Sequence, residues 1–161
     1  MVLAIIAIGT AMAAPSLNTL VNDRRAEVGA SQLVSAIRLA RAEAVKRASM
    51  VVIRPVWSGT SLAQWVVRTE SDRNPSTRES GDVDLRQFAL PASTRVLGIH
   101  SSDAPGPALL AFDVFGRNVA VSPGGSPETR QLILCNGASG LSLSISAMGS
   151  VAVQRGDALV C

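Results

Sequence analysis

Aromatic, histidine and cysteine residues are scarce in this chain of 161 residues. Phe, Trp and Tyr together make up 3% of it, with no Tyr at all, which argues against a stacking platform for single-stranded nucleic acid. The chain holds one histidine, His100, and two cysteines, Cys135 and Cys161, whereas zinc sites usually need three or four such ligands. We therefore expect no metal site and no cofactor.

Charged residues are also few, at 17%, while apolar residues make up 47%, which is typical of a folded domain rather than a disordered tail. The length fits one domain, or one domain with an appendage. The net charge of +3 lies wholly in residues 1–48, because residues 49–161 hold nine basic and nine acidic side chains. A neutral body is a poor electrostatic surface for DNA.

Signatures of catalysis are missing as well. His100 is followed by Ser101, Ser102 and Asp103, but neighbours in sequence do not usually form a catalytic triad, and no G-x-S-x-G motif is present. Residues 123–127 (PGGSP) lack the Gly-Lys ending and the following helix of a phosphate-binding loop, so we predict a turn there. We expect this protein not to be an enzyme.

Residues 1–14 form an apolar run, interrupted only by Gly9 and Thr10. The run is shorter than the roughly 20 residues that a membrane span needs. It could be a signal peptide cleaved near residues 11–13, a buried helix, or the C-terminal part of a membrane helix. A signal peptide needs a basic residue before the apolar run, and none is present in this sequence. A buried helix at a terminus needs a polar face toward water, and this run is apolar on all sides. The residues that we expect to contact lipid in the third case are Val2, Leu3, Ile5, Ile6, Ile8 and Met12.

Residues 15–48 have the pattern of an amphipathic helix, with apolar residues mostly three, four or seven apart. The predicted stripe consists of Leu17, Leu20, Val21, Val28, Leu33, Ile37, Ala40, Ala44 and Ala48. Pro15, at the junction, is predicted to kink the helix or to begin a second one. Because the helical pattern resumes directly after Pro15, we favour one long helix, half in lipid and half packed on a domain.

Residues 49–161 change to short β-type runs separated by turn residues, which predicts an antiparallel β domain of about 110 residues. The alternation in residues 141–146 (LSLSIS) predicts one face toward the core. Residues 70–82 and 101–107 are predicted loops. The predicted strands are 51–57, 64–69, 84–90, 95–100, 109–115, 118–122, 130–135, 141–146 and 150–155.

This order of parts resembles the type IV pilin-like families, and its details are most similar to the GspH/FimT group of minor pilins and pseudopilins. Residues 32–47 (QLVSAIRLARAEAVKR) resemble the end of the family's helix. Trp57 and residues 65–67 (WVV) resemble its "W…GW.V" hairpin, with Gln64 where glycine is usual. Residues 112–117 (FDVFGR) resemble its "F…GR" turn, so that the resemblance spans nearly the whole chain.

The resemblance implies an α+β, pilin-like fold: a long N-terminal helix packed on an antiparallel β-rich head. Residues 1–14 would be the membrane-helix segment, 15–48 the amphipathic helix and 49–161 a periplasmic head. The family's glycine cleavage site and following glutamate are absent, so we expect the sequence to begin downstream of the true start. The implied protein is a single-pass inner-membrane subunit, located at or near a filament tip. Its implied partners are other pilin or pseudopilin subunits and inner-membrane lipid.

A periplasmic head would lie in an oxidising compartment, where Cys135 and Cys161 would form a disulfide. The alternative is two free buried thiols. The residues are too far apart in sequence for a C-x-x-C redox motif.

Some members of the family bind DNA through a Gly-Arg-x-Arg pattern near the C-terminus, but the matching residues here, 149–152 (GSVA), contain no arginine. Arg117 and Arg155 remain as weak candidates for DNA contact, and residues 101–161 carry a net charge of −1. We expect a structural subunit of a type II secretion or type IV pilus filament, the cysteine pair and the tryptophans favouring the pilus. The alternatives are a DNA-binding minor pilin in DNA uptake and a periplasmic β-domain exported by signal peptide cleavage.

Overall fold

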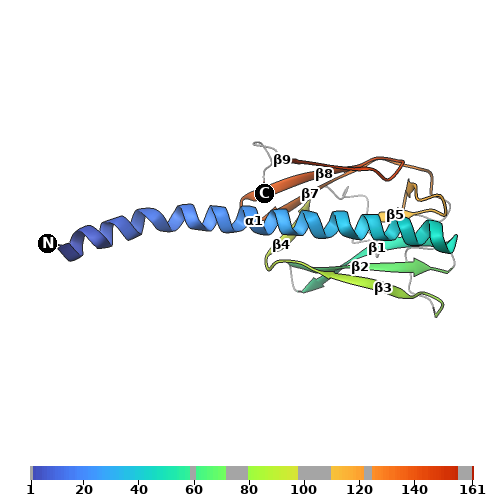
Figure 1. The fold of residues 1–161 in the computed structure, drawn as a ribbon, viewed down its shortest axis with the longest axis horizontal. Helices are drawn as coiled ribbons and strands as arrows, with labels where there is room; N and C mark the ends of the chain where they lie inside the picture. Colours follow the sequence, from blue (N-terminus) through green and yellow to red (C-terminus); the bar gives the residue numbers. More distant parts are fainter. Residues whose placement is uncertain (1, 59–60, 72–79, 98–109, 122–124, 156–160) are drawn as a thin grey trace.

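A single long helix lies across two antiparallel sheets in the computed structural model of residues 1–161 (Figure 1). The structure describes residues 2–58, 61–71, 80–97, 110–121, 125–155 and 161, with backbone alone for residues 2–16. This architecture confirms the predicted α+β fold. His100, the predicted loop 101–107 and most of the predicted loop 70–82 lie outside the described residues, as do residues 123 and 124 of the predicted turn.

Helix α1 runs from Val2 to Arg47. It passes through Pro15 without interruption, so the proline does not begin a second helix. At the other end the Ser49 amide donates to the Ala44 carbonyl, and Ala48 adopts a left-handed φ of 49°. This pair of features closes the helix at Arg47, one residue before the predicted end. No helix in the described part of the chain has an apolar stretch long enough to cross a membrane.

The nine described strands form two sheets, in which all neighbouring strands are antiparallel. The first has the order β3-β2-β1-β5-β6 and the second the order β4-β7-β8-β9. Their bounds are β1 Met50–Ser58, β2 Ser61–Glu70, β3 Asp84–Ala89, β4 Thr94–Leu97, β5 Leu110–Phe112, β6 Asn118–Val119, β7 Arg130–Asn136, β8 Ser139–Ile145 and β9 Val151–Arg155. Each falls on a predicted run. Strand β5 is shorter than predicted because the chain turns at Asp113, whose carboxylate accepts the Phe115 and Arg117 amides.

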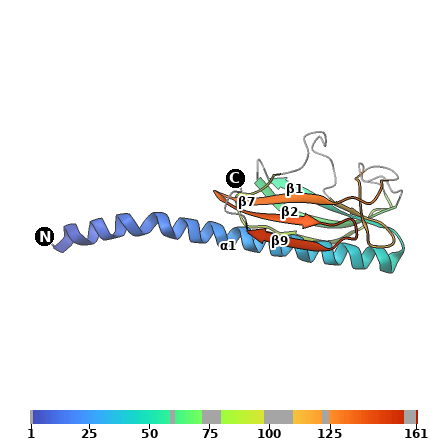
Figure 2. The same ribbon diagram turned by 90° about the horizontal axis from the view of Figure 1, so that it is seen from above.

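The core lies between α1 and both sheets, on the side of the sheets that faces the helix in Figure 2. Leu33 and Ile37 are fully buried there, as are Leu143 and Ile145 of β8, and Leu141 of the same strand is 6% exposed. Small residues make up the rest of the helix's buried face, because alanine lets a helix approach a sheet closely. They are Ala26, Gly29, Ala30, Ala36, Ala40 and Ala44.

The predicted stripe is therefore correct only over its second half, which contains Leu33, Ile37, Ala40 and Ala44. The larger residues of its first half are exposed, as is Ala48, while the smaller Ala26 and Ala30 face the sheets. The real stripe keeps the alternating three- and four-residue spacing through these alanines. Helical periodicity alone does not separate a face that packs on the same chain from one that stays free.

Candidate subunit interface

Four large apolar side chains of α1 point away from the core and form what we call the helix face. Leu17, Leu20, Val21 and Val28 are 60%, 54%, 44% and 48% exposed, respectively. They lie where the helix leaves the head, and in Figure 1 the segment N-terminal to them projects without any strand beside it. An exposed apolar stripe of this kind is a typical contact surface for another helix or for lipid.

A groove of about 350 Å³ deepens the helix face. Its walls are Leu20, Val21 and Val28 of α1 and Pro91, which follows β3, and Arg24 and Arg25 complete its lining. Pro91 is a residue of this interface that the sequence did not indicate. The mainly apolar lining of the groove suits the packing of a side chain from a neighbouring helix.

Three charged residues of this region are paired along the helix and across to the second sheet. Arg24 Nη1 lies 2.9 Å from Glu27 Oε2, and Arg155 Nη2 of β9 lies 2.5 Å from Glu27 Oε1. The predicted DNA-contact residue Arg155 thus connects β9 to α1. Both pairs are exposed, so each contributes only a fraction of a kcal/mol to about 1 kcal/mol of stability.

Arg117, the other predicted DNA-contact residue, lies at the opposite end of the head. Its side chain donates to Asp113 Oδ2 at 2.7 Å, and its guanidinium carbon lies 5.0 Å from the centre of the Phe115 ring. Arg41, which contacts the adjacent Gly116, is fourteen residues from Glu27, about 21 Å along a helix. The structure therefore does not bring Arg117 and Arg155 into one surface.

The carboxylate of Asp113 holds the turn at this opposite end. Burial opposes its ionisation, but hydrogen bonds from the Arg117 side chain and from the Arg117 and Phe115 amides outweigh burial and lower the pKa of Asp113. The ionised, multiply bonded carboxylate fixes the direction of the turn after β5.

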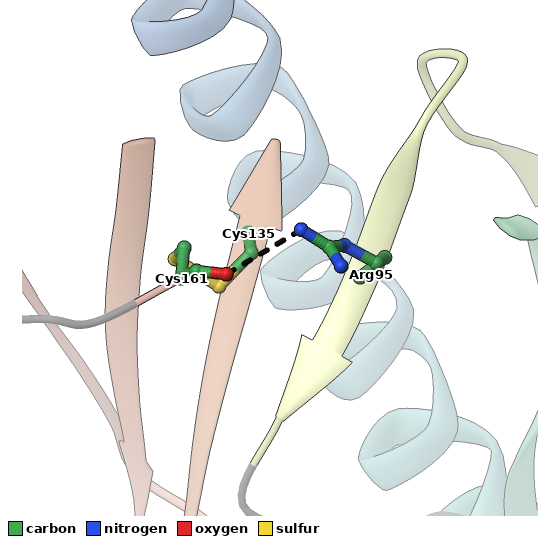
Figure 3. Close-up of a disulfide and its surroundings, with 3 residues drawn as sticks. All are labelled: Arg95, Cys135 and Cys161. Carbon is green, nitrogen blue, oxygen red and sulfur yellow. Dashed lines mark hydrogen bonds between the residues drawn. A yellow bond between two sulfur atoms is a disulfide. The ribbon is translucent and has the colours of Figure 1, made fainter. Parts of the chain in front are cut away.

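Cys135 of β7 and Cys161 are joined by a disulfide (Figure 3). Arg95 of β4 donates to the carbonyl oxygen of Cys161 at 3.4 Å, so that Cys161 is tied to two strands. Figure 1 places this tether at the end of the head from which α1 emerges. The described residues contain no group of three or more His, Cys, Asp or Glu side chains arranged to hold a metal ion.

The sequence matches the family described as "Type II transport protein GspH" over residues 29–149, about three quarters of the chain. The chain belongs to the GspH family. The match begins in α1 just after the helix face and ends in the turn before β9, so it includes the first sheet and all of the second sheet except β9. This confirms the family that the sequence resembles. No curated protein sequence matches the chain.

Solved structures show the same fold. The type IV minor pilin FimU of Pseudomonas aeruginosa superposes with a TM-score of 0.55 at 19% identity, covering 82% of this chain and 90% of FimU. A second crystal form of FimU gives 0.53 at 20% identity, with 80% and 92% covered. The minor pseudopilin EpsH from the type II secretion system of Vibrio cholerae gives 0.50 at 11% identity, with 85% and 99% covered. The GspH-family chain therefore has the fold of minor pilins and pseudopilins.

The structure places the sequence-predicted residues as follows. Cys135 and Cys161 are brought together, whereas Arg117 and Arg155 are not. Val2, Leu3, Ile5, Ile6, Ile8, Met12 and Pro15 lie in the first part of α1, and their side chains are outside the described part of the structure.

Proposed function

We propose that this GspH-family chain is a structural minor pilin or pseudopilin whose helix packs among the helices of other subunits in a type II secretion or type IV pilus filament. The helix face carries the proposal. Leu17, Leu20, Val21 and Val28 belong to the same continuous helix that anchors the core, yet about half of their surface is exposed in the described structure. A rigid helix with one face on its own head and another apolar face free is suited to packing in a bundle.

We infer the cellular location of the subunit from the same helix. Residues 1–14 would hold the subunit in the inner membrane before assembly, and the head would lie in the periplasm. The Cys135–Cys161 disulfide supports a periplasmic head, because disulfides persist in oxidising compartments. The names of FimU and EpsH support a minor subunit, and we place it at or near the filament tip.

DNA uptake is less well supported by the described residues. Arg155 is paired with Glu27 and Arg117 with Asp113, at opposite ends of the head. DNA binding gains affinity from several cations that release counterions from one continuous tract.

Replacement of Leu20 by Ser tests the proposal, with Val153→Ser as the matched control. Both residues are about half exposed, at 54% and 47%, but Val153 lies on β9 rather than on the helix face. In cells that lack the natural copy, each variant is measured by immunoblot in the membrane fraction and in sheared filaments. We expect Leu20→Ser to reach the membrane but to be depleted from filaments, and Val153→Ser to behave like the natural protein. Normal incorporation of Leu20→Ser would contradict the role of the helix face.

A further inference from the structure

Three segments meet at the end of the head farthest from the N-terminus, which we call the distal end. They are the last turns of α1, the turn 113–117 and the turn 146–150. Arg41 Nε donates to the Gly116 carbonyl at 3.0 Å. Gly149 lies against the same pair, because a Cβ added to it would be 2.6 Å from Arg41 Nε and 2.8 Å from the Gly116 oxygen. The two turns are therefore fixed on the helix.

The distal end presents apolar side chains to solvent. Phe115 is 72% exposed and Met148 67% exposed, the two highest values among the large apolar side chains of the described residues. Val45 of α1, whose side chain lies beside Gly116, is 55% exposed. Turns on a protein surface normally carry polar residues, and aromatic and methionine side chains are enriched at protein interfaces. Rigidly mounted apolar residues of this kind act as interface anchors.

The charge around these anchors is positive. Within the three segments, Glu43 and Asp113 oppose five cations, so the net charge of these segments is +3. The cations are Arg38, Arg41, Lys46, Arg47 and Arg117. A shallow hollow of about 490 Å³ lies among them, lined by Arg38, Arg41, Ala42, Val45, Lys46 and Gly116. Of the five cations, only Arg38 has no ion pair or backbone acceptor within the described residues.

This combination fits a protein partner better than DNA. Lys46 and Arg47 are bound to Glu43, at 3.8 and 2.6 Å, and Arg117 is bound to Asp113. A surface with one unpaired arginine and three exposed apolar anchors offers little counterion release to a phosphate backbone. Apolar anchors surrounded by a charged rim are the usual anatomy of a protein interface.

A second copy of this chain does not complement the surface. Two distal ends face to face would bring +3 against +3. Among the side chains that the structure describes, the other end of the head carries Asp23 and Glu27 against four arginines, a net charge of +2. The four are Arg24, Arg25, Arg95 and Arg155. Head-to-tail contact would thus also oppose like charges, which costs affinity.

We propose that the distal end is the docking surface for the acidic head of a different pilin-like subunit, with Phe115 and Met148 as apolar anchors and Arg38 at the charged rim. The proposal rests on the filament function proposed above and assigns it a second contact, separate from the helix face. The helix face binds sideways to other helices, and the distal end binds along the helix axis to another head.

The test measures binding between full-length proteins in detergent micelles. This chain is immobilised, and each other pilin-like subunit of the same filament is passed over it. We expect a subunit with an acidic head to bind, Phe115→Ala to weaken that binding about tenfold, and the double variant Phe115→Ala/Met148→Ala to weaken it further. Arg38→Glu should slow association and reduce its dependence on salt. Val153 is an exposed residue of β9, and Val153→Ala should leave binding unchanged.

Three outcomes would overturn the inference. The first is binding unaffected by the Phe115, Met148 and Arg38 variants. The second is a protein that enters filaments but binds none of the acidic-headed subunits. The third is retention on a short DNA duplex, at low salt, that Arg38→Glu abolishes in the absence of any subunit binding. A different result would contradict the proposed filament function: a natural chain that neither enters filaments nor binds any subunit.

Discussion

At the scale of single residues, Asp113 determines how the distal end is built. Its Oδ1 accepts the amides of Phe115 and Arg117 at 3.0 and 2.9 Å, and its Oδ2 accepts the Arg117 side chain. These bonds end β5, reverse the chain and place Phe115 outward. One carboxylate thus connects a buried strand to an exposed anchor.

Asp113→Asn tests the charge of this residue, since asparagine keeps an oxygen for the two amides but loses the ion pair with Arg117. The lowered pKa means that the unfolded chain binds the proton more tightly than the folded one. The stabilisation is therefore fully present above the ordinary pKa of 3.8 and is lost as pH falls through the lowered value. We expect Asp113→Asn to be about 1 kcal/mol less stable at neutral pH, with the difference shrinking as pH falls through the lowered pKa. Urea unfolding at neutral pH and in acid measures the difference; a difference that persists unchanged in acid would contradict the prediction.

Gly149→Ala and Gly137→Ala form a matched pair at the two ends of the head. Both glycines have positive φ, 76° and 61°, so each alanine has the strain of about 1–2 kcal/mol of a left-handed conformation. At Gly149 the new methyl group would also meet the Gly116 carbonyl, which is backbone and is fixed by Arg41. At Gly137 it would meet the amide end of Asn22, which can rotate away.

The expected loss is thus about 1–2 kcal/mol for Gly137→Ala and clearly more for Gly149→Ala. Chemical denaturation of the two variants compares them directly. Equal losses would show that Arg41 does not hold the two distal turns together.

Some of the turns and side-chain contacts could be predicted from residue types, and others could not. The turn around Gly116 and the hairpin at Gly137 follow from glycine placement alone. The exposure of Phe115 could not be predicted, because an apolar residue beside a strand usually faces the core. The buried pair between Arg54 and Glu70, 3.0 Å apart, was also unpredicted, since it depends on strand register.

At the scale of elements, α1 has one face that packs in the core and another that is exposed to solvent. Its alanine-rich face contacts both sheets, and the helix face stays open at the point where α1 leaves the head. The sequence predicted the extent of the helix to within one residue at each end and the position of every described strand, because hydrophobic periodicity and turn residues mark them, although β5 and β6 are shorter than predicted. It did not separate the two faces, since Leu20 and Leu33 have the same side chain and differ only in what lies opposite.

Leu33→Ala and Leu20→Ala should therefore differ in their effect on the free energy of unfolding. Leu33 is fully buried, so its truncation leaves a cavity and should cost about 2–5 kcal/mol of unfolding free energy. Leu20 is 54% exposed, and its truncation should change stability by no more than about 0.5 kcal/mol. Thermal or urea unfolding in detergent distinguishes them. Comparable losses from the two variants would place Leu20 in the core and remove the basis for the helix face.

At the scale of the whole molecule, the disulfide ties Cys161 to the second sheet. Cys135 lies in β7, in the interior of the second sheet, and Cys161 follows β9 at its edge. The bond spans 26 residues and encloses β8 and β9. The pairing was predicted from the expected oxidising compartment, because the local sequence around either cysteine contains no signal for it.

Reduction should lower the unfolding free energy by about 3–4 kcal/mol, the chain-entropy value for a loop of this length. The double variant Cys135→Ser/Cys161→Ser should show the same loss and no further response to reductant. Urea unfolding with and without dithiothreitol gives both values. A reductant effect of equal size in the double variant would assign the loss to some other cause.

The tether of Cys161 decides where the molecule can be labelled. Because the disulfide and Arg95 hold this residue at the end from which α1 emerges, an epitope fused after it would lie near the helix face rather than at the distal end. Antibody would reach such an epitope on the free subunit and be shielded from it once neighbouring helices pack alongside. The same tag would then act as a reporter that distinguishes the membrane pool from the assembled one.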